Sequence, residues 1–269
     1  MICPKLALSS RPVHLPTLRR VNHSSASSSA LRIAAMSSSF SAAVATPIEH
    51  IVLIKARPDE ADAATAMVSA LQALATQVPG LAHLHAGPVL RLGSPAAAAL
   101  GPTHVLHARY AAKSDLAAYA AHPAHVAAVR AHVLPVALDT TAVDWVNAAP
   151  AASPVAPGSV VRLTLAKAHD GVDPAQVVET VTAATKAAAE IMGAAKVSFG
   201  VSFGENFASP ERAKGYQFGM VVIFDTVEEL DAVEGNEKVL EARAGVRSQL
   251  DDVCVLDFVV GPAADASTI

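Results

Sequence analysis

The fold is decided by the stretch IEHIVLIKARPDEADAATAMVSALQALATQVPG at residues 48–80. Side chains alternate along a β-branched run over 48–55, which predicts a strand. The segment 59–78 then predicts an amphipathic helix that ends at Pro79-Gly80, because its large apolar residues recur every three or four positions: Met67, Leu71, Leu74 and Val78. A strand followed by a helix is the expected start of a mixed α and β unit.

Four more elements complete this first unit. The pattern predicts further strands over 81–90, 103–110 and 140–146, and a helix that begins near Ser114, runs to 121 and resumes from Pro123 to 134. The element order is therefore βαββαβ, which is the ferredoxin-like order of an antiparallel sheet with helices on one face.

The same order returns after a Pro- and Ala-rich linker at 147–158. The second unit has predicted strands over 160–167, 195–203, 216–224 and 253–260, with helices over 173–192 and 227–250. Three anchor pairs recur at nearly constant spacing across the two units: His50 with Arg162, Thr103 with Gln217, and Asp144 with Asp257.

Each unit should leave one apolar sheet face to be buried. Two units on one short tether can press these faces together, so we expect an α+β fold in which two ferredoxin-like units form an internal pseudo-dimer, their sheets closed or nearly closed into a β-barrel with helices outside. Further homo-oligomerisation remains open. The expected segments are a leader at 1–46, a first domain at 47–147, a linker at 148–158, a second domain at 159–261 and a tail at 262–269.

The leader has the composition of a transit peptide. It is rich in Ser, contains five basic residues before position 36, and has no Asp or Glu before Glu49. We expect a plastid address, with mitochondria as the second reading and a disordered tail without a targeting role as the plain alternative. The C-terminal Ser267-Thr268-Ile269 weakly resembles the Ser-Lys-Leu peroxisomal signal. Peroxisome and cytosol are therefore kept as alternative locations.

Composition excludes several classes of function. Hydrophobic residues make up 52% of the chain and mean hydropathy is +0.38, yet each apolar run is interrupted before the about 20 residues of a spanning helix. Loss of residues 1–35 changes the formal net charge from −4 to −9, so nucleic-acid binding has no basic surface to use. Cys254 is then the single cysteine, which excludes an internal disulfide.

Four motifs resemble the stress-responsive dimeric A/B barrel family. They are HIVLIK at 50–55, VPG at 78–80, GPTH at 101–104 and YAAHPAHV at 119–126, of which His-Pro-Ala-His is the most specific. The resemblance covers both units, strongly in the first and weakly in the second, and the tandem layout is similar to two-domain plant members. It implies α+β barrels and a stress-response protein that binds a small apolar ligand or acts through its own stability, with no cofactor required.

The resemblance extends to a plant polyketide cyclase and so implies an alternative function. Residue types used there match a base at His125, a hydroxyl donor at Tyr119 and an orienting carboxylate at Asp144. This set suits aldol closure of a poly-β-ketone, since imidazole can take an acidic C–H proton while a hydroxyl polarises the carbonyl. Other histidines expected at a cavity are His50, His104 and His122, with the first two expected to point into the barrel.

The family resemblance also implies a Mg²⁺ site. Family members hold this ion with backbone carbonyls at the end of the first helix, and the matching positions are Ala75, Val78 and Leu81. Carbonyls at a helix end are free acceptors, and a hard cation prefers oxygen ligands. A haem- or quinol-oxidising monooxygenase is less favoured, because Trp145 is the single Trp and no Asn/Trp/His set is recognisable.

Plainer interpretations stand beside these. Asp144 recurs as Asp257 in a unit that has lost the other groups, which favours a structural role. His107 and Arg109 alternate with the expected inward set and are predicted to lie on the surface. His83 and His85 share one strand face as a metal pair, but the sequence offers no third ligand. The second unit is expected only to complete the barrel.

Overall fold

The computed structural model describes residues 47–147, 155–181, 183, 196–201 and 211–262 of the 269-residue chain. The elements of the first repeat are β1 (Ile48–Ala56), α1 (Ala61–Gln77), β2 (Leu81–Leu92), α2 (Pro95–Leu100), β3 (His104–Tyr110), α3 (Lys113–Ala121), α4 (Pro123–Ala128), the π-helical turn η1 (Val129–Val133) and β4 (Ala137–Val146). This order is the predicted βαββαβ with one short helix added.

The second repeat contains the same kinds of element. They are β5 (Val160–Ala168), a helix described over 174–181, β6 (Lys196–Val201), β7 (Phe218–Phe224), α6 (Val227–Glu234), α7 (Glu237–Arg247) and β8 (Leu250–Val259). The remainder of the helix predicted to reach 192 lies outside the described residues, as do the leader, linker positions 148–154 and the last seven residues.

The eight described strands belong to one antiparallel sheet in the order β4-β1-β3-β2-β8-β5-β7-β6. The repeats join where β2 pairs with β8, with Val89 opposite Phe258 and Leu92 opposite Leu256. Strands β4 and β6 are the two edges, so the sheet is open at the seam between them. The pairing of two ferredoxin-like units is confirmed, and of the two expected forms, closed or nearly closed, the closed barrel is wrong. Near the seam, Ala142 N–H donates to the Arg212 carbonyl at 3.0 Å.

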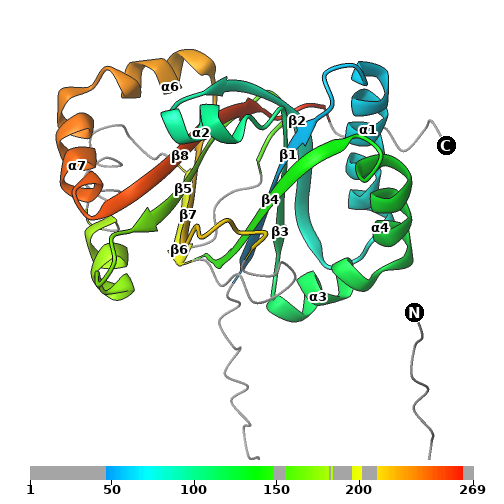
Figure 1. Ribbon diagram of the computed structural model, residues 1–269, viewed down its shortest axis with the longest axis horizontal. Helices are drawn as coiled ribbons and strands as arrows, with labels where there is room; N and C mark the ends of the chain where they lie inside the picture. Colours follow the sequence, from blue (N-terminus) through cyan, green and yellow to red (C-terminus); the bar gives the residue numbers. More distant parts are fainter. Residues whose placement is uncertain (1–46, 148–154, 182, 184–195, 202–210, 263–269) are drawn as a thin grey trace, which may run out of the picture. The chain divides into compact units, whose positions relative to one another are not determined.

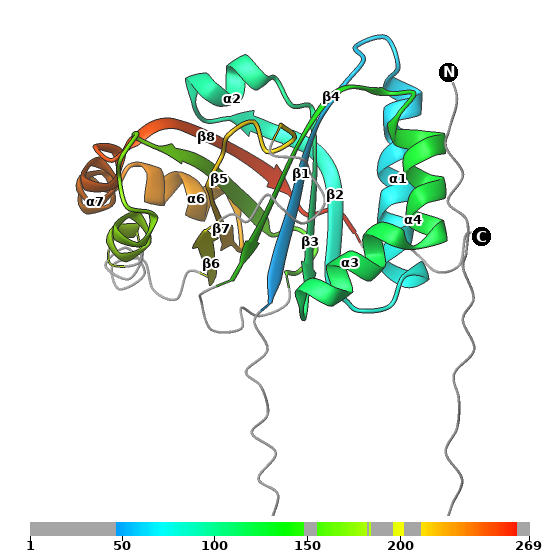
Figure 2. The same ribbon diagram turned by 60° about the horizontal axis from the view of Figure 1, so that its bottom comes forward.

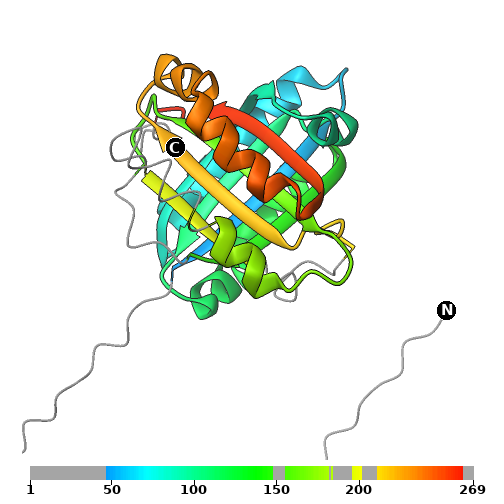
Figure 3. The same cartoon turned by 90° about the vertical axis from the view of Figure 1, so that its left-hand side faces the viewer.

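Helices cover the outer faces of the strands in both repeats. Helices α1, α3 and α4 lie against β1–β4, whereas α6 and α7 lie against β5–β8 (Figures 1 and 3). One core cluster contains residues of both repeats, including Ile51, Trp145 and Leu163, and therefore fills the space between the two inner sheet faces. Each strand of β1–β4 is thus covered on both sides, by helices and by the other repeat (Figure 2).

The predicted helix 59–78 forms for the expected reason. Met67, Leu71 and Leu74 of α1 are buried against the sheet. The helix ends at Gln77 with Val78 as its C-cap, and Gly80 follows with a φ of +87°, which suits glycine. Two other expectations need correction. Helix α2 was not predicted, although Ser94 caps it and Pro95 begins it. The single helix expected over 227–250 is two helices, because Gly235-Asn236 interrupts it.

The register of the strands confirms the repeat anchors. His50 lies opposite Asp144, and Arg162 lies opposite Asp257, on matching strand pairs. Thr103 and Gln217 also play matching parts, because their side-chain oxygens accept the backbone N–H of Ala56 and Ala168 at 2.9 Å in each case. These two alanines follow the register shifts at the ends of β1 and β5.

Candidate functional site

An aromatic and histidine cluster lies between the first-repeat sheet and helices α3 and α4. The rings of Tyr119 and His125 have centroids 4.4 Å apart, and the Tyr119 ring is 5.3 Å from that of Tyr110. His50 meets both tyrosine rings edge-on at 6.3 Å. Strand β1 supplies His50, β3 supplies Tyr110, and α3 and α4 supply the other two. The structure therefore brings Tyr119, His125 and His50 together as predicted, and adds Tyr110.

Asp144 joins this cluster through His50 and not through His125. Its Oδ1 is 2.5 Å from His50 Nδ1, and both side chains are buried. His125 Nδ1 instead lies 3.1 Å from the Ala120 carbonyl, to which it donates as the Nδ1–H tautomer. The expected carboxylate partner of His125 is thus replaced by a backbone carbonyl, which leaves its Nε2 as the basic nitrogen.

Burial sets the protonation of this cluster. It lowers the pKa of His125, although the Ala120 hydrogen bond opposes this effect and the charges of His50 and Arg212 add to it. Burial also raises the pKa of both Tyr110 and Tyr119 well above the usual range. At neutral pH the cluster therefore offers a neutral imidazole and protonated phenols, which is a base beside hydrogen-bond donors.

Of the two other predicted cavity residues, His104 lies apart from the cluster, whereas His122 is near enough for its charge to lower the pKa of His125. His104 begins β3 and pairs with Ile54, four residues or about 13 Å along the strand from the position opposite His50. His122 caps α4, because its Nδ1 accepts the Ala124 N–H at 3.2 Å. The predicted direction is wrong as well: His50 packs on the helix side with Tyr119, not toward the other repeat.

The expected Mg²⁺ positions lie at the end of α1 and the start of β2. Because residue 79 is a proline without an N–H, the Ala75 carbonyl has no helical partner four residues on. A Cβ added at Gly80 would lie 3.7 Å from Asp115 Oδ1, so the carboxylate of Asp115 lies beside this turn. Free carbonyl and carboxylate oxygens suit a hard cation, and Val78 and Leu81 flank the same turn. The donor chemistry therefore fits Mg²⁺, whose binding stays a prediction.

A second polar cluster faces the other repeat and was not predicted from the sequence. Glu49, His107 and Arg109, predicted in part to be surface residues, are buried. Arg109 Nε donates to Glu49 Oε1 at 2.7 Å, and Glu49 Oε2 is 2.8 Å from His107 Nε2. The alternation correctly predicts that these residues share one face of the sheet, but that face packs against the second repeat and is not exposed to water.

A cavity lies in the second repeat, which was expected only to complete the barrel. Its volume is about 460 Å³, and it is lined by residues of β5, β7, β8, helix 174–181, α6 and α7, together with residues 93–95 of the first repeat. Its walls are mainly apolar, as shown by Val177, Phe218, Met220, Val239 and Val253.

Charged side chains also line this cavity. Arg162 donates from Nε and Nη2 to the two oxygens of Asp257 at 2.7 and 2.9 Å, and it also pairs with Glu234. Arg243 Nη1 meets Glu234 Oε1 at 2.5 Å. Arg162 and Arg243 thus each face a carboxylate, whereas Arg247, which also lines the cavity, donates from Nη1 to the Leu250 carbonyl.

Within the described part of the chain, no helix has the length and apolar character needed to cross a bilayer.

Comparisons with known proteins agree with this architecture. The sequence profile of the stress responsive A/B barrel domain matches residues 48–147 and 160–260. Two relatives from Arabidopsis thaliana are both stress-response A/B barrel domain-containing proteins. They are 37% and 34% identical over 82% and 79% of this chain, and the aligned regions cover 82% and 96% of the relatives.

A solved structure described as an anthrone oxidase-like protein matches 82% of this chain and 94% of its own, with a TM-score of 0.56 and 11% identity. At that identity it supports the fold alone. Two matches to one domain, together with relatives that span most of the chain, establish that this protein is a tandem member of the stress-responsive A/B barrel family.

Proposed function

We propose that the protein binds a small, largely apolar ligand in the cavity of the second repeat. The observation that carries this proposal is the cavity of about 460 Å³, which falls within the 300–1,000 Å³ typical of ligand sites. Burial of an apolar molecule there would be favourable by about 25 cal/mol for each Å² removed from water.

The polar groups of the cavity favour a neutral ligand over a strongly charged one. Arg162 is bonded at two points to Asp257, and an anionic ligand that pairs with Arg162 would have to compete with that buried carboxylate. Thr164 and Ser94 also line the cavity and provide hydroxyl groups without net charge. The expected ligand is therefore an apolar body with one or two hydrogen-bonding groups.

The test is fluorescence titration of the full chain with 1-anilinonaphthalene, a neutral apolar probe. Saturable binding at one site per chain is expected, and excess decanol should displace the probe. Ala242 lines the cavity from α7, so Ala242→Phe should fill part of the volume and weaken binding by about tenfold or more, equivalent to about 1.4 kcal/mol.

Ala232→Phe is the matched control, because Ala232 is exposed on the neighbouring helix α6 and does not line the cavity. It should bind the probe like the unchanged protein. Binding that is not saturable, or that is equally weakened by both substitutions, would contradict the proposed site.

A second candidate function is aldol cyclisation of a β-polyketone at the first repeat. It is supported by the contact between Tyr119 and His125 and by burial of His125, which lowers the pKa of its imidazole. His125 Nε2 would remove an acidic C–H proton, the resulting carbanion would form a C–C bond to a ketone carbon, and Tyr119 would donate a proton to the new alkoxide. The 460 Å³ cavity does not include these residues, so the two functions would use separate sites.

This second function predicts cyclised product from a tetraketide or pentaketide substrate with the purified protein. His125→Ala should abolish that product, whereas His132→Ala, which changes another histidine of the same region, should not. A rate equal to the uncatalysed reaction for the unchanged protein would remove the cyclase from consideration without affecting probe binding in the second repeat.

A further inference from the structure

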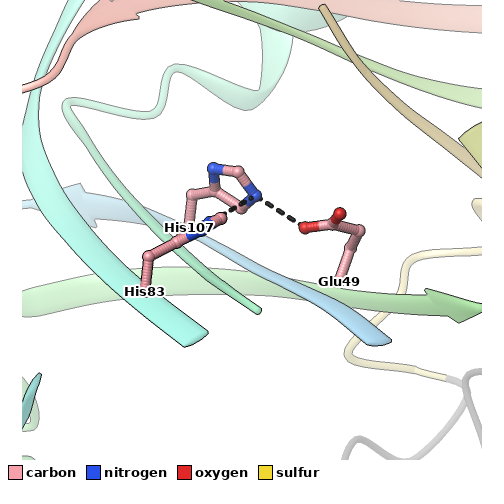
Figure 4. A group of neighbouring side chains, drawn as sticks. All are labelled: Glu49, His83 and His107. Atoms are coloured by element: carbon pink, nitrogen blue, oxygen red, sulfur yellow. Dashed lines mark hydrogen bonds and ion pairs between the residues drawn. The ribbon is translucent and has the colours of Figure 1, made fainter. Parts of the chain in front are cut away.

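Three potential metal-ligating atoms converge on the inner face of the first-repeat sheet. They are Glu49 Oε2, His83 Nε2 and His107 Nε2, which all lie within 4.8 Å of one another (Figure 4). His107 Nε2 is 2.8 Å from the carboxylate and 3.4 Å from His83 Nε2. Strand β3 lies between β1 and β2 in the sheet, so it carries His107 between the other two ligands.

We propose that Glu49, His83 and His107 bind a divalent transition-metal ion, with Zn²⁺ as the first candidate. Ligand atoms of a tetrahedral zinc site are about 3.3 Å apart, given Zn–N bonds of about 2.05 Å, and the two imidazole nitrogens already have nearly this spacing. Two imidazoles and one carboxylate are a ligand set that Zn²⁺, Fe²⁺ and Mn²⁺ accept.

Hydrogen bonds alone satisfy the three ligand atoms poorly. A neutral imidazole has one N–H, and the Nε2–H of His107 is required by Glu49. The contact of 3.4 Å between the two Nε2 atoms is then a weak one, because the same hydrogen cannot point well at both partners. A metal ion accepts all three lone pairs at once.

The carboxylate is oriented by groups outside the ligand set. Arg109 and Asn147 both donate to Glu49 Oε1, at 2.7 Å from Nε and 3.0 Å from Nδ2. Both bonds fall on one oxygen and leave Oε2 directed at the histidines. Supporting hydrogen bonds of this kind orient ligands in known metal sites. The Arg109 charge repels a cation, so the affinity should be lower than in a zinc site without a neighbouring guanidinium.

The second repeat shows that the fold does not need polar groups at these positions. Val161 follows Val160 on β5 as Glu49 follows Ile48 on β1, and Val221 and Ile223 occupy the β7 positions that match His107 and Arg109. All three are buried apolar residues. Burial of charged groups carries a large desolvation cost, so their presence in one repeat alone indicates a purpose other than folding.

An ion could reach the site from the His83 side. Glu49 and His107 are buried, but His83 is only partly so. His85 stacks beside it with ring centroids 5.1 Å apart, and its Nε2 has no hydrogen-bond partner among the described residues. The histidines identified in sequence as a metal pair thus lie at the edge of the site, whose other two ligands come from β1 and β3.

The test uses untagged full-length protein freed of metal with a chelator. Isothermal titration with Zn²⁺ should give saturable binding of one ion per chain, and Co²⁺ should give the visible absorption bands of a histidine-ligated ion. His83→Ala should weaken Zn²⁺ binding by at least about tenfold and remove the cobalt bands. His83 is less buried than Glu49 and His107, so its removal should disturb folding least, which circular dichroism checks.

His132→Ala is the matched control, since it removes an imidazole from η1 without touching the three ligands. It should bind Zn²⁺ like the unchanged protein. The proposal is overturned if the unchanged protein shows no saturable binding, or if His83→Ala and His132→Ala bind equally well. Glu49→Gln is a second test variant. Loss of the carboxylate charge should weaken Zn²⁺ binding, while Arg109 can still donate to the amide oxygen.

Discussion

The carboxylate of Asp257 is fully buried and meets Arg162 through both of its oxygens, while Arg91 Nε approaches Oδ2 at 3.0 Å. Asp257→Ala would leave Arg162 buried with Glu234 as its remaining carboxylate. We expect a loss of about 3 kcal/mol in the free energy of unfolding, the low end of the range for a broken buried pair. Urea denaturation followed by circular dichroism measures it.

Asp251→Ala provides the control for this prediction. Asp251 pairs with His169, and both side chains are about half exposed. Exposed pairs contribute at most about 1 kcal/mol, so this substitution should change the unfolding midpoint only slightly. Equal losses for the two variants would mean that burial of the Arg162 pair does not determine its contribution.

Cys254 should be protected from alkylation in the folded protein. Burial, with the Asp252 charge as a smaller cause, raises the pKa of its thiol from 9.0 to about 12. Only the thiolate reacts, so iodoacetamide at pH 8.5 should label Cys254 in urea but not in buffer, as read by mass spectrometry. The chain for this measurement carries Cys3→Ser, because Cys3 is the other cysteine.

The same shift predicts a loss of stability at high pH. Between pH 9 and 12 the folded state keeps the thiol proton whereas the unfolded state releases it. Unfolding then releases a proton, and the free energy of unfolding falls as pH rises through that interval. Cys254→Ala should flatten this part of the pH dependence, and an unchanged slope would contradict the assignment.

A local sequence motif predicted part of the aromatic and histidine cluster of the first repeat. The contact of Tyr119 with His125 follows from the YAAHPAHV motif, since the two residues flank one short helix break. The partner of Asp144 could not be deduced in this way. Strand register places Asp144 directly opposite His50, and register depends on pairing over the whole strand, which a motif does not contain.

At the scale of elements, Asn236 determines where α7 begins. Its Oδ1 accepts the N–H groups of Lys238 and Val239 at 3.1 and 3.3 Å. Asn236→Ala should therefore cost about 1 kcal/mol, measured by thermal or urea unfolding. Because Val239, Leu240 and Arg243 of this helix line the cavity, probe binding should weaken as well.

Asn236→Asp is the matched variant, since its carboxylate can accept the same two bonds and is favourable at a helix N-terminus. It should retain both stability and probe binding. If Asp destabilises the protein as much as Ala does, capping is not the contribution of this residue.

Strands were easier to predict than helix boundaries. The alternation over 48–55 locates β1 to within a residue, because side-chain period is the property that a sheet requires. The interval 227–250 looked like one helix since its apolar spacing continues across Gly235-Asn236. Asn236 instead caps a new helix, α7, because Asn side chains favour cap positions over helix interiors.

At the scale of the molecule, the sequence predicted the tandem repeat and the burial of one sheet against the other. It did not predict which side chains face the interface. His107 and Arg109 of β3 were expected to face water, but helices cover one face of the sheet and the second repeat covers the other. The polar residues Glu49 and His107 therefore lie inside, where composition alone would not place them.

A close approach between the repeats, at Gly219 and Trp145, gives the last prediction. A Cβ added at Gly219 of β7 would lie 2.2 Å from Trp145 Cε3 of β4, which is far inside van der Waals contact. Gly219→Ala should therefore force the strands apart and cost about 3 kcal/mol, the upper part of the usual range for overpacking. Trp145 is fully buried and is the single Trp of the chain, so a red shift of its emission should accompany the loss.

A double-mutant cycle separates this clash from any intrinsic preference of Ala in β7. Trp145→Leu removes the ring, and in that background Gly219→Ala should cost less than about 1 kcal/mol, giving a coupling of about 2 kcal/mol between the two positions. Circular dichroism follows this cycle, since the fluorophore is lost. If the two costs simply add, the indole does not determine the spacing of β4 and β7. A large coupling would identify Gly219 as the residue that lets the two repeats pack at the seam where their strand edges do not pair.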